Sequence, residues 1–296
     1  MRRPTSVELM LLVTIVLWAL NLTVTRTILT HGFQPLAYAG VRYGLAAAVF
    51  VGLTLVAERT LRILRSDLPL ALAAGLVLFL NQIAFVYALK TTTASTVALI
   101  LGATPAFAAL LGLTFGTEQP SSRFWAGAVV SFAGVGLVAA GAGHLAGGAV
   151  GILLGIATAA TWAAYSVAIA PLMRRYSPSR ISALVLAIAC APIAIVGAPQ
   201  LADQDWSVGW DIWALLLFAT LGPLVVTNIL WFRSLHRIGP ARATLAANLQ
   251  PFVAAVFAVV LLSEEISALQ VLGGILIAGG ILLARRGGPL RAPQAE

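Results

Sequence analysis

The sequence predicts an all-α polytopic membrane protein, with ten transmembrane helices arranged as an inverted 5+5 repeat. Three observations lead to this fold class. First, 60% of the residues are hydrophobic and only 9% are charged. Second, apolar runs long enough to cross a bilayer recur along the chain. Third, a segment with a proline at its centre occurs twice. An ordinary soluble domain carries roughly 25% charged residues. A transmembrane barrel would show short segments in which apolar and polar residues alternate, and this sequence lacks them.

Ten apolar runs of about 20 residues give the expected helices. We expect the first five at residues 7–27, 35–57, 68–89, 93–115 and 121–141, and the second five at residues 148–171, 177–197, 212–235, 240–262 and 267–284. The connecting segments are short and contain turn-forming residues, as in THGFQP and RRYSPSR. We therefore expect no soluble domain between the helices.

Positive charges set the expected orientation in the membrane. Fourteen of the 18 Lys and Arg residues fall on one side, whereas Arg26 and Lys90 fall on the other. Because cytoplasmic loops carry an excess of Lys and Arg, we expect a multi-pass protein of the cell (inner) membrane with both termini in the cytoplasm. The formal net charge of +8 then reflects contact with anionic lipid, and we expect no nucleic-acid partner.

The two halves of the chain carry a repeated segment. Residues 88–134 align without a gap on residues 234–280, and nine of the 47 positions are identical. The identical positions include Leu89 and Leu235, Pro105 and Pro251, Glu118 and Glu264, Ser121 and Ser267, Gly127 and Gly273, and Gly134 and Gly280. Proline and glutamate are uncommon in this sequence, so their shared offset of 146 residues indicates an internal duplication.

The duplication predicts two units of opposite orientation, residues 1–143 and 144–296. A shorter echo pairs LWALN at residues 17–21 with TWAAY at residues 161–165, at an offset of 144. Each unit holds five spans, an odd number, so the second unit enters the membrane from the opposite side. Such inverted repeats expose a site near the middle of the bilayer to each side in turn.

Pro105 and Pro251 stand inside apolar runs that would otherwise form continuous helices. A proline in a helix interior removes a backbone donor and bends the chain. We interpret both prolines as bends in the fourth and ninth helices that serve gating, where freed carbonyls lie beside protein or a water-lined cavity. The alternative is that each proline only shapes helix packing.

Two long segments resemble the EamA-like proteins of the drug/metabolite transporter superfamily. They are ALKTTTASTVALILGATPAFAALLGLTFGTEQPSSRFWAGAVVSFAGVGLV at residues 88–138 and SLHRIGPARATLAANLQPFVAAVFAVVLLSEEISALQVLGGILIAGGILL at residues 234–283. The resemblance implies a ten-helix exporter with a central cavity lined mainly by helices one, three, four, six, eight and nine. The aromatic-rich set described next is most similar to that of the aromatic amino-acid exporters among bacterial members.

Polar and aromatic side chains inside the spans are the candidate substrate-binding residues, because polar groups are costly at membrane depth. Amides bind amino or carboxylate groups, and aromatic faces stack on rings or attract an ammonium group. The candidates are Trp18, Asn21, Phe79, Asn81, Gln82, Trp162, Tyr165, Asn228, Trp231 and Asn248. The alternative for each amide is a hydrogen bond that only joins neighbouring helices.

Three charged residues near the spans have two interpretations each. Arg42 lies seven residues into the second helix, where it is a candidate contact for a substrate carboxylate or else extends to the membrane interface. Glu118 and Glu264 directly precede the fifth and tenth helices. Acidic side chains stabilise helix N-termini, so we favour a capping role over a transport role for both.

Cys190 is the only cysteine, and no G-x-S-x-G motif or His cluster occurs, so we expect no metal, no cofactor and no intramembrane enzyme. Apart from Glu8, at the mouth of the first span, no Asp or Glu falls inside an expected span, which favours uncoupled, facilitated transport. With the resemblance, we expect export of amphipathic metabolites, most of all aromatic or neutral amino acids. The alternative is a proton-coupled multidrug or organic-cation exporter. The expected partners are a small-molecule substrate and the lipid bilayer, with the chain a monomer or weak homodimer.

Overall fold

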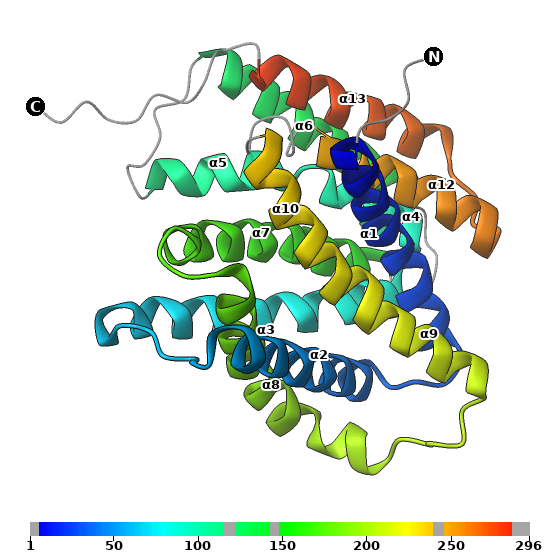
Figure 1. Cartoon of the computed structure of the whole chain (residues 1–296). Helices are drawn as coiled ribbons and strands as arrows, with labels where there is room; N and C mark the ends of the chain where they lie inside the picture. The colour runs from blue at the N-terminus through cyan, green and yellow to red at the C-terminus, as the bar shows by residue number, and fades with distance from the viewer. Residues whose placement is uncertain (1–5, 115–121, 143–147, 239–245, 286–296) are drawn as a thin grey trace, which may run out of the picture.

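The computed structural model describes residues 6–114, 122–142, 148–238 and 246–285, which form helices and their connections (Figure 1). In the first half these are α1 (Ser6–Thr30), α2 (Pro35–Glu58), the short 3₁₀ helix η1 (Arg65–Asp67), α3 (Leu68–Thr91), α4 (Ala94–Leu101), α5 (Thr104–Thr114) and α6 (Ser122–Gly141). In the second half they are α7 (Gly148–Met173), α8 (Pro178–Ala202), α9 (Trp210–Thr220), the π-helix η2 (Leu221–Val226), α10 (Thr227–Ile238), α12 (Gln250–Leu262) and α13 (Ala268–Arg285).

The described helices confirm a polytopic all-α protein. Eight described segments are long and apolar enough to cross a membrane, and α12 and α13 are two shorter apolar helices. Two of the crossing segments combine elements, since α4 with α5 forms one span and α9, η2 and α10 form another. The ten spans lie where the sequence predicts them, although residues 239–245, at the start of the ninth, lie outside the described residues.

The two halves run through the bundle in opposite directions. Lys90, at the end of α3, donates from Nζ to the Leu29 carbonyl at the end of α1, with 2.7 Å between the atoms. Arg237, near the end of α10, donates from Nη1 to the Ser6 hydroxyl at the start of α1. Since α1 has 25 residues, its ends are about 37 Å apart at 1.5 Å per residue. The third span of one repeat and the third span of the other therefore end on opposite sides.

Glycines bring α6 and α13 into backbone contact. A Cβ atom added to Gly134 would lie 2.6 Å from the Gly273 carbonyl oxygen, and one added to Gly273 would lie 2.6 Å from the Gly134 carbonyl oxygen. Gly127 and Gly280 approach each other in the same way. Because Gly127 is equivalent to Gly273 and Gly134 to Gly280, the two contacts exchange under the repeat. A pseudo-two-fold axis thus passes between these helices, as inverted repeats require.

The fourth and ninth spans are interrupted rather than bent. The break falls at Gly102 and Ala103, between α4 and α5, and at Asn248 and Leu249, just before α12. These two breaks are 146 residues apart, so they occupy the same position in both repeats. Each proline is the second residue of the helix that follows, where its fixed φ angle suits a helix start.

A hydroxyl group satisfies the carbonyl that the first break leaves free. Pro105 has no N–H to donate to the Leu101 carbonyl four residues earlier. Thr104 donates its hydroxyl to that carbonyl instead, with 2.7 Å between the oxygens. The break is therefore compatible with burial inside the membrane, where unpaired backbone groups are costly.

A second proline effect occurs in the eighth span, which the sequence predicts as one continuous helix. The π-helical segment η2 contains Pro223, and single turns of π-helix are common where the hydrogen-bond ladder is disturbed. Pro223 has no N–H for the Ala219 carbonyl four residues earlier. That carbonyl accepts a hydrogen bond from Arg42 of α2 instead.

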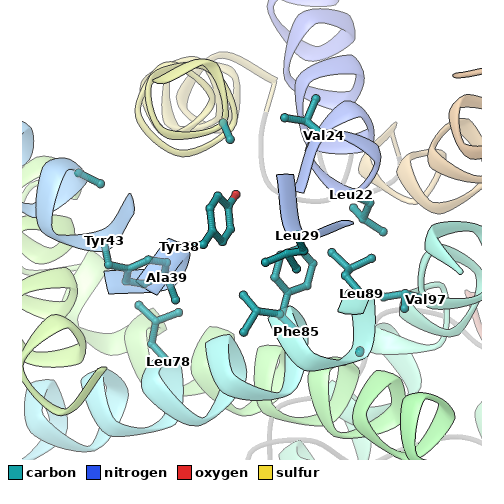
Figure 2. Close-up of a cluster of buried hydrophobic side chains, with 14 of the residues drawn as sticks. Leu22, Val24, Leu29, Tyr38, Ala39, Tyr43, Leu78, Phe85, Leu89 and Val97 are labelled. Carbon is teal, nitrogen blue, oxygen red and sulfur yellow. The ribbon is translucent and has the colours of Figure 1, made fainter. Parts of the chain in front are cut away.

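The largest apolar cluster joins the first three helices to the second repeat. Figure 2 shows Tyr38 and Tyr43 of α2 among the side chains of Leu29 of α1 and of Phe85 and Leu89 of α3. The helix α2 packs along α8, and α3 packs along α7. The core is thus built from both repeats, and Tyr38 and Tyr43 of α2 lie within it.

Ion pairs between the repeats hold both ends of the bundle. We call one end the Glu264 end, after the pair of Arg26 with Glu264. We call the opposite end the Arg180 end, because Arg180 pairs there with Glu58 at 2.5 Å. The Arg180 end also holds a pair between Asp67 and Arg175, at 2.6 Å. These contacts connect the repeats outside the apolar layer.

Candidate substrate-binding site

A tryptophan with an aromatic neighbour stands at an equivalent position in each of the two repeats. Trp18 on α1 packs against Trp231 on α10, with ring centroids 5.2 Å apart and planes tilted by 54°. Trp162 and Tyr165 lie one turn apart on α7, with centroids 5.4 Å apart. All four side chains are half-buried or exposed, and Trp162 is 41% exposed. Trp18 and Trp162 are equivalent at the offset of 144, so the repeat places an aromatic ring twice.

Asn21 lies one turn after Trp18, on the same face of α1, and contacts a buried cation. Its Oδ1 accepts a hydrogen bond from Arg42 Nη2, with 2.9 Å between the atoms. Arg42 is only 4% exposed, so its side chain is enclosed by neighbouring helices. Arg42 Nε donates to the Ala219 carbonyl at 3.3 Å, and the guanidinium lies 5.8 Å from the centre of the Tyr38 ring.

Asn81 and Gln82 lie between α3 and α7. Asn81 is buried and donates from Nδ2 to the Thr158 carbonyl at 2.9 Å and to the Thr161 hydroxyl at 3.1 Å. Gln82 donates from Nε2 to Asn81 Oδ1 at 3.1 Å, and its Oε1 is buried without a hydrogen-bond partner. Asn81 therefore joins two helices, while Gln82 keeps one acceptor open.

The other predicted binding residues are distributed over three elements. Phe79 of α3 is partly buried and packs on the large apolar cluster. Asn228 of α10 is half-buried, and its Oδ1 accepts from the Ser182 hydroxyl of α8 at 3.4 Å. Asn248 lies in the break before α12, at the position that Gly102 occupies in the first repeat. The break in the second repeat thus carries a polar side chain and the break in the first does not.

Tyrosines of α2 connect these groups, although the sequence pattern did not single them out as binding residues. The Tyr38 hydroxyl lies 2.9 Å from the Thr25 hydroxyl of α1, and both side chains are fully buried. Tyr43 follows Arg42 and is buried in the large apolar cluster, on which Tyr165 of α7 also packs. The signal in the sequence is the spacing Tyr38, Arg42, Tyr43 within two turns of one helix.

A separate cavity of about 380 Å³ opens between α3, α5 and α7. It is lined by Val77, Leu80, Phe107, Leu110, Leu111, Ala160, Thr161 and Ala164. None of the ten predicted binding residues lines this cavity, and Leu80 in its wall is 52% exposed. Its apolar lining resembles the lipid-facing surface more than a site for a polar solute.

Glu264 caps a different helix from the one that its sequence position suggests. Its carboxylate accepts hydrogen bonds from the backbone N–H groups of Ala94 and Ser95, each at 2.8 Å, at the start of α4. The helix α13 is capped instead by Ser267 and Gln270, whose side chains bond to each other's backbone N–H groups. This is a capping box, so α13 needs no glutamate. Glu118 lies outside the described residues.

Acidic side chains are confined to the ends of the described helices and to their connections. They are Glu8, Glu58, Asp67, Asp203, Asp205, Asp211, Glu264 and Glu265. Among the described residues, no three His, Cys, Asp or Glu side chains gather in a way that would hold a metal ion. Away from the helix ends, the polar side-chain groups of the described spans are therefore mainly amides, hydroxyls, indole N–H groups and the guanidinium of Arg42.

The sequence profile of the EamA-like transporter family matches this chain twice, at residues 5–140 and at residues 149–286. The chain belongs to the EamA-like transporter family. Its relatives are named as transporters or efflux pumps, so this EamA-like protein is a membrane transporter and not an enzyme.

Several relatives are similar over nearly the whole length. The chain is 27% identical over 286 residues to a "Probable amino-acid metabolite efflux pump" of Salmonella typhimurium, covering 92% of both chains. A protein of the same name from Escherichia coli K12 gives the same identity and coverage. A "Probable terminal-alkyne amino-acid exporter" of Streptantibioticus cattleyicolor is 25% identical over 300 residues, covering 91% of this chain and 93% of the relative.

The fold of this EamA-like transporter is also found in a solved crystal structure. The two align with a TM-score of 0.66 at 22% sequence identity, over 96% of this chain and 98% of the other. At this identity the likeness concerns the fold alone.

Proposed function

We propose that this transporter exports small amphipathic metabolites, above all aromatic or neutral amino acids, by alternating access through a central cavity. Two kinds of observation support the substrate class. Relatives that match over more than nine-tenths of their length are named for amino-acid efflux or export. The spans also place aromatic rings beside amides, a lining suited to a solute with an apolar side chain and a polar backbone.

The observation that carries the proposal is the tryptophan that recurs in both repeats. Trp18 on α1 and Trp162 on α7 occupy equivalent positions, and each has an aromatic partner within 5.4 Å. Recurrence of the ring is expected if the two repeats contribute equivalent walls to one central cavity. The proposed lining is Trp18, Asn21, Phe79, Asn81, Gln82, Trp162, Tyr165, Asn228, Trp231 and Asn248.

The interrupted helices are the proposed moving parts. Pro105 and Pro251 start the second segments of the fourth and ninth spans, and the preceding breaks lie at equivalent positions. Backbone away from a regular helix changes its angles more easily, and broken helices are common around transporter sites. Alternating access then consists of residues 1–143 and 144–296 rocking against each other around the site.

The proposed transport is not coupled to protons, and both termini of the chain face the cytoplasm. Export follows the solute's own gradient, because the acids in the described spans lie only at helix ends. The Arg180 end faces the cytoplasm of the cell (inner) membrane, since it carries most of the positive charge. The chain works as a monomer or weak homodimer and needs no cofactor.

Flux into proteoliposomes tests the substrate class. A panel of amino acids and hydrophobic cations is measured with the wild-type chain, with Trp18→Ala and Trp162→Ala, and with Trp210→Ala as the matched control. Trp210 is 81% exposed, so its loss is expected to leave transport unchanged. We expect aromatic amino-acid flux to fall at least about tenfold in the first two variants, the equivalent of about 1.4 kcal/mol. Flux of cations alone, driven by a proton gradient, would favour a multidrug exporter and overturn the proposal.

Cysteine labelling in whole cells tests the orientation. In a Cys190→Ser background, Lys90→Cys and Arg237→Cys each place one thiol at opposite ends of α1. An impermeant maleimide is expected to label the thiol at 90 and not the thiol at 237. Labelling of both positions from outside would refute the proposed orientation.

A further inference from the structure

We infer that Arg42 binds the carboxylate of the exported solute, so that the site selects zwitterions or monocarboxylates over cations. The inference rests on the proposed function, because it names the group by which that site holds its substrate. Arg42 lies about 10 Å along α2 from Pro35, at 1.5 Å per residue. This depth places its charge inside the apolar layer rather than at its surface.

The charge of Arg42 has no acidic partner in the described part of the chain. Its guanidinium contacts the Asn21 amide, the Ala219 carbonyl and the Tyr38 ring, and all three are neutral. The ion pairs found at the two ends of the bundle involve other arginines. A buried charge without a counterion is costly, and such residues in membrane spans mark binding sites or ion pathways.

The guanidinium of Arg42 keeps donors free for a ligand. Arginine has five N–H groups, and the two hydrogen bonds described use one on Nε and one on Nη2. Among the described residues, Nη1 has no hydrogen-bond partner. A carboxylate is the ligand that matches the planar fork of donors, because it accepts two parallel hydrogen bonds.

Pro223 leaves free one of the two acceptors that hold the Arg42 guanidinium in place. Because Pro223 cannot donate to the Ala219 carbonyl, that carbonyl is free to accept from Arg42 Nε, 3.3 Å away. Asn21 holds the other side of the group. A side chain fixed by two neutral acceptors is positioned before a ligand arrives, which lowers the entropy lost on binding.

The repeat shows that Arg42 is not part of the shared scaffold. At offsets of 144 to 146 the equivalent positions are Leu186, Ala187 and Ile188, all of them apolar. Both repeats contain the glycines of the α6–α13 contact (Gly127, Gly134, Gly273 and Gly280), which we call the glycine seam, and both contain a helix break. The cation occurs in only one repeat. A single cation suits a single carboxylate, and a doubly charged substrate would call for a second.

The neighbours of Arg42 indicate what the rest of the solute looks like. Asn21 lies one turn from Trp18, whose ring packs on Trp231, and Tyr43, the residue after Arg42, is buried in the apolar cluster on which Tyr165 of α7 packs. A solute whose carboxylate lies at Arg42 therefore has aromatic surfaces within about one helical turn. The site fits a monocarboxylate with an apolar or aromatic side chain.

A comparison of phenylalanine with phenylalaninamide tests the inference, because the two differ only at the carboxylate. Counterflow in proteoliposomes is measured for the wild-type chain, Arg42→Gln and Arg42→Lys. The control variant is Arg59→Gln, which removes a positive charge from the exposed end of the same helix. Charge-assisted hydrogen bonds are strong enough that Arg42→Gln is expected to raise the half-saturating concentration of phenylalanine about 10- to 100-fold.

The amide separates a binding role from a structural one. We expect Arg42→Gln to change the half-saturating concentration of the amide by less than about threefold, and Arg42→Lys to restore part of the preference for phenylalanine. If Arg42 only stabilised the fold, the variant would impair both compounds equally, and that result overturns the inference. The inference is also overturned if the wild-type chain transports phenylalanine and Arg42→Gln keeps the same preference for phenylalanine over its amide. That result would leave the proposed function intact.

Two further outcomes can be judged from the wild-type chain alone, without Arg42→Gln. If Arg42→Gln does not fold, wild-type thermal stabilisation by the two compounds gives the answer, since a ligand stabilises in proportion to its affinity. Equal stabilisation by phenylalanine and its amide overturns the inference, and stabilisation by phenylalanine alone supports it. If the wild-type chain transports no amino acid of the panel, the proposed function fails and this inference fails with it.

Discussion

Glu264 of the second repeat forms an ion pair with Arg26 of the first repeat, with 3.1 Å between Oε1 and Nε. The same carboxylate caps the start of α4 through the N–H groups of Ala94 and Ser95. Arg26 also donates to the Leu89 and Thr92 carbonyls at the end of α3. One side chain after α12 thus holds three segments of the other repeat together. If the two repeats rock against each other as proposed, these contacts must break for the site to open at the Glu264 end.

We predict that Arg26 and Glu264 are energetically coupled. A double-mutant cycle with Arg26→Ala and Glu264→Gln should give a coupling energy of about 1–3 kcal/mol, because the Glu264 carboxylate is nearly buried and removal of either partner leaves a charge unpaired. The measurement is unfolding in mixed detergent micelles. Glu265→Gln is the control, since that neighbouring side chain is exposed. Additive effects of the two substitutions would contradict the coupling.

Alanine at the glycines of the α6–α13 contact should destabilise the protein. A Cβ on Gly134 or Gly273 would lie 2.6 Å from a carbonyl oxygen of the other helix, so the helices must separate at a cost of about 1–3 kcal/mol each. Gly136 and Gly279, on the same two helices, have nothing within 4 Å of an added Cβ. Alanine at these control positions should be neutral or stabilising by roughly 0.5–1 kcal/mol. Equal effects at all four positions, measured by thermal unfolding in detergent, would show that the seam is not tightly packed.

Replacement of Pro223 should weaken substrate binding from a distance. Pro223→Ala provides an N–H for the Ala219 carbonyl, which then competes with Arg42 Nε for that acceptor. We expect the half-saturating concentration of phenylalanine to rise about threefold to tenfold, the equivalent of about 0.7–1.4 kcal/mol, with thermal stability unchanged or higher. Pro192→Ala is the matched control, because Pro192 lies inside α8 and the two hydrogen bonds of Arg42 go to α1 and α9 instead. An equal loss of affinity in both variants would argue against this role of Pro223.

Transport should proceed without a proton gradient. The acidic side chains of the described part lie at helix ends or in connections, so no buried carboxylate is available there to carry a proton through the apolar layer. In proteoliposomes, phenylalanine flux down its own gradient should be unchanged when nigericin collapses the pH difference. Stoichiometric proton counterflow, recorded with an internal pH dye, is the result that would refute uncoupled transport.

Hydropathy and repetition were sufficient to predict the ten spans and their inverted order. Apolar length marks each span whatever its neighbours are, and the shared offset of Pro105 with Pro251 and of Gly134 with Gly280 marks the repeat. The exact breaks could not be predicted in the same way. A proline indicates a disturbed helix, but the break fell at Gly102 and Ala103 because Thr104 satisfies the freed carbonyl.

Contacts between distant segments limited what the sequence could predict about the site. Arg42 looked able to extend to the interface from its place in the second helix, and the structure buries it against Ala219 of another span. Glu264 precedes α13, yet it caps α4, because Ser267 and Gln270 already serve the nearer helix. Both outcomes depend on which helices become neighbours, and local pattern carries no information about that.

The glycine seam has a consequence for the origin of the chain. Its two contacts, Gly127 with Gly280 and Gly134 with Gly273, exchange under the repeat, which is the property of an isologous interface between two copies of one protein. If an ancestral five-helix chain inserted into the membrane in both orientations, two copies of opposite orientation would have formed a dimer through this surface. Gene fusion then needed to supply only the link between the copies, and each copy was afterwards free to acquire residues, such as Arg42, that the other lacks.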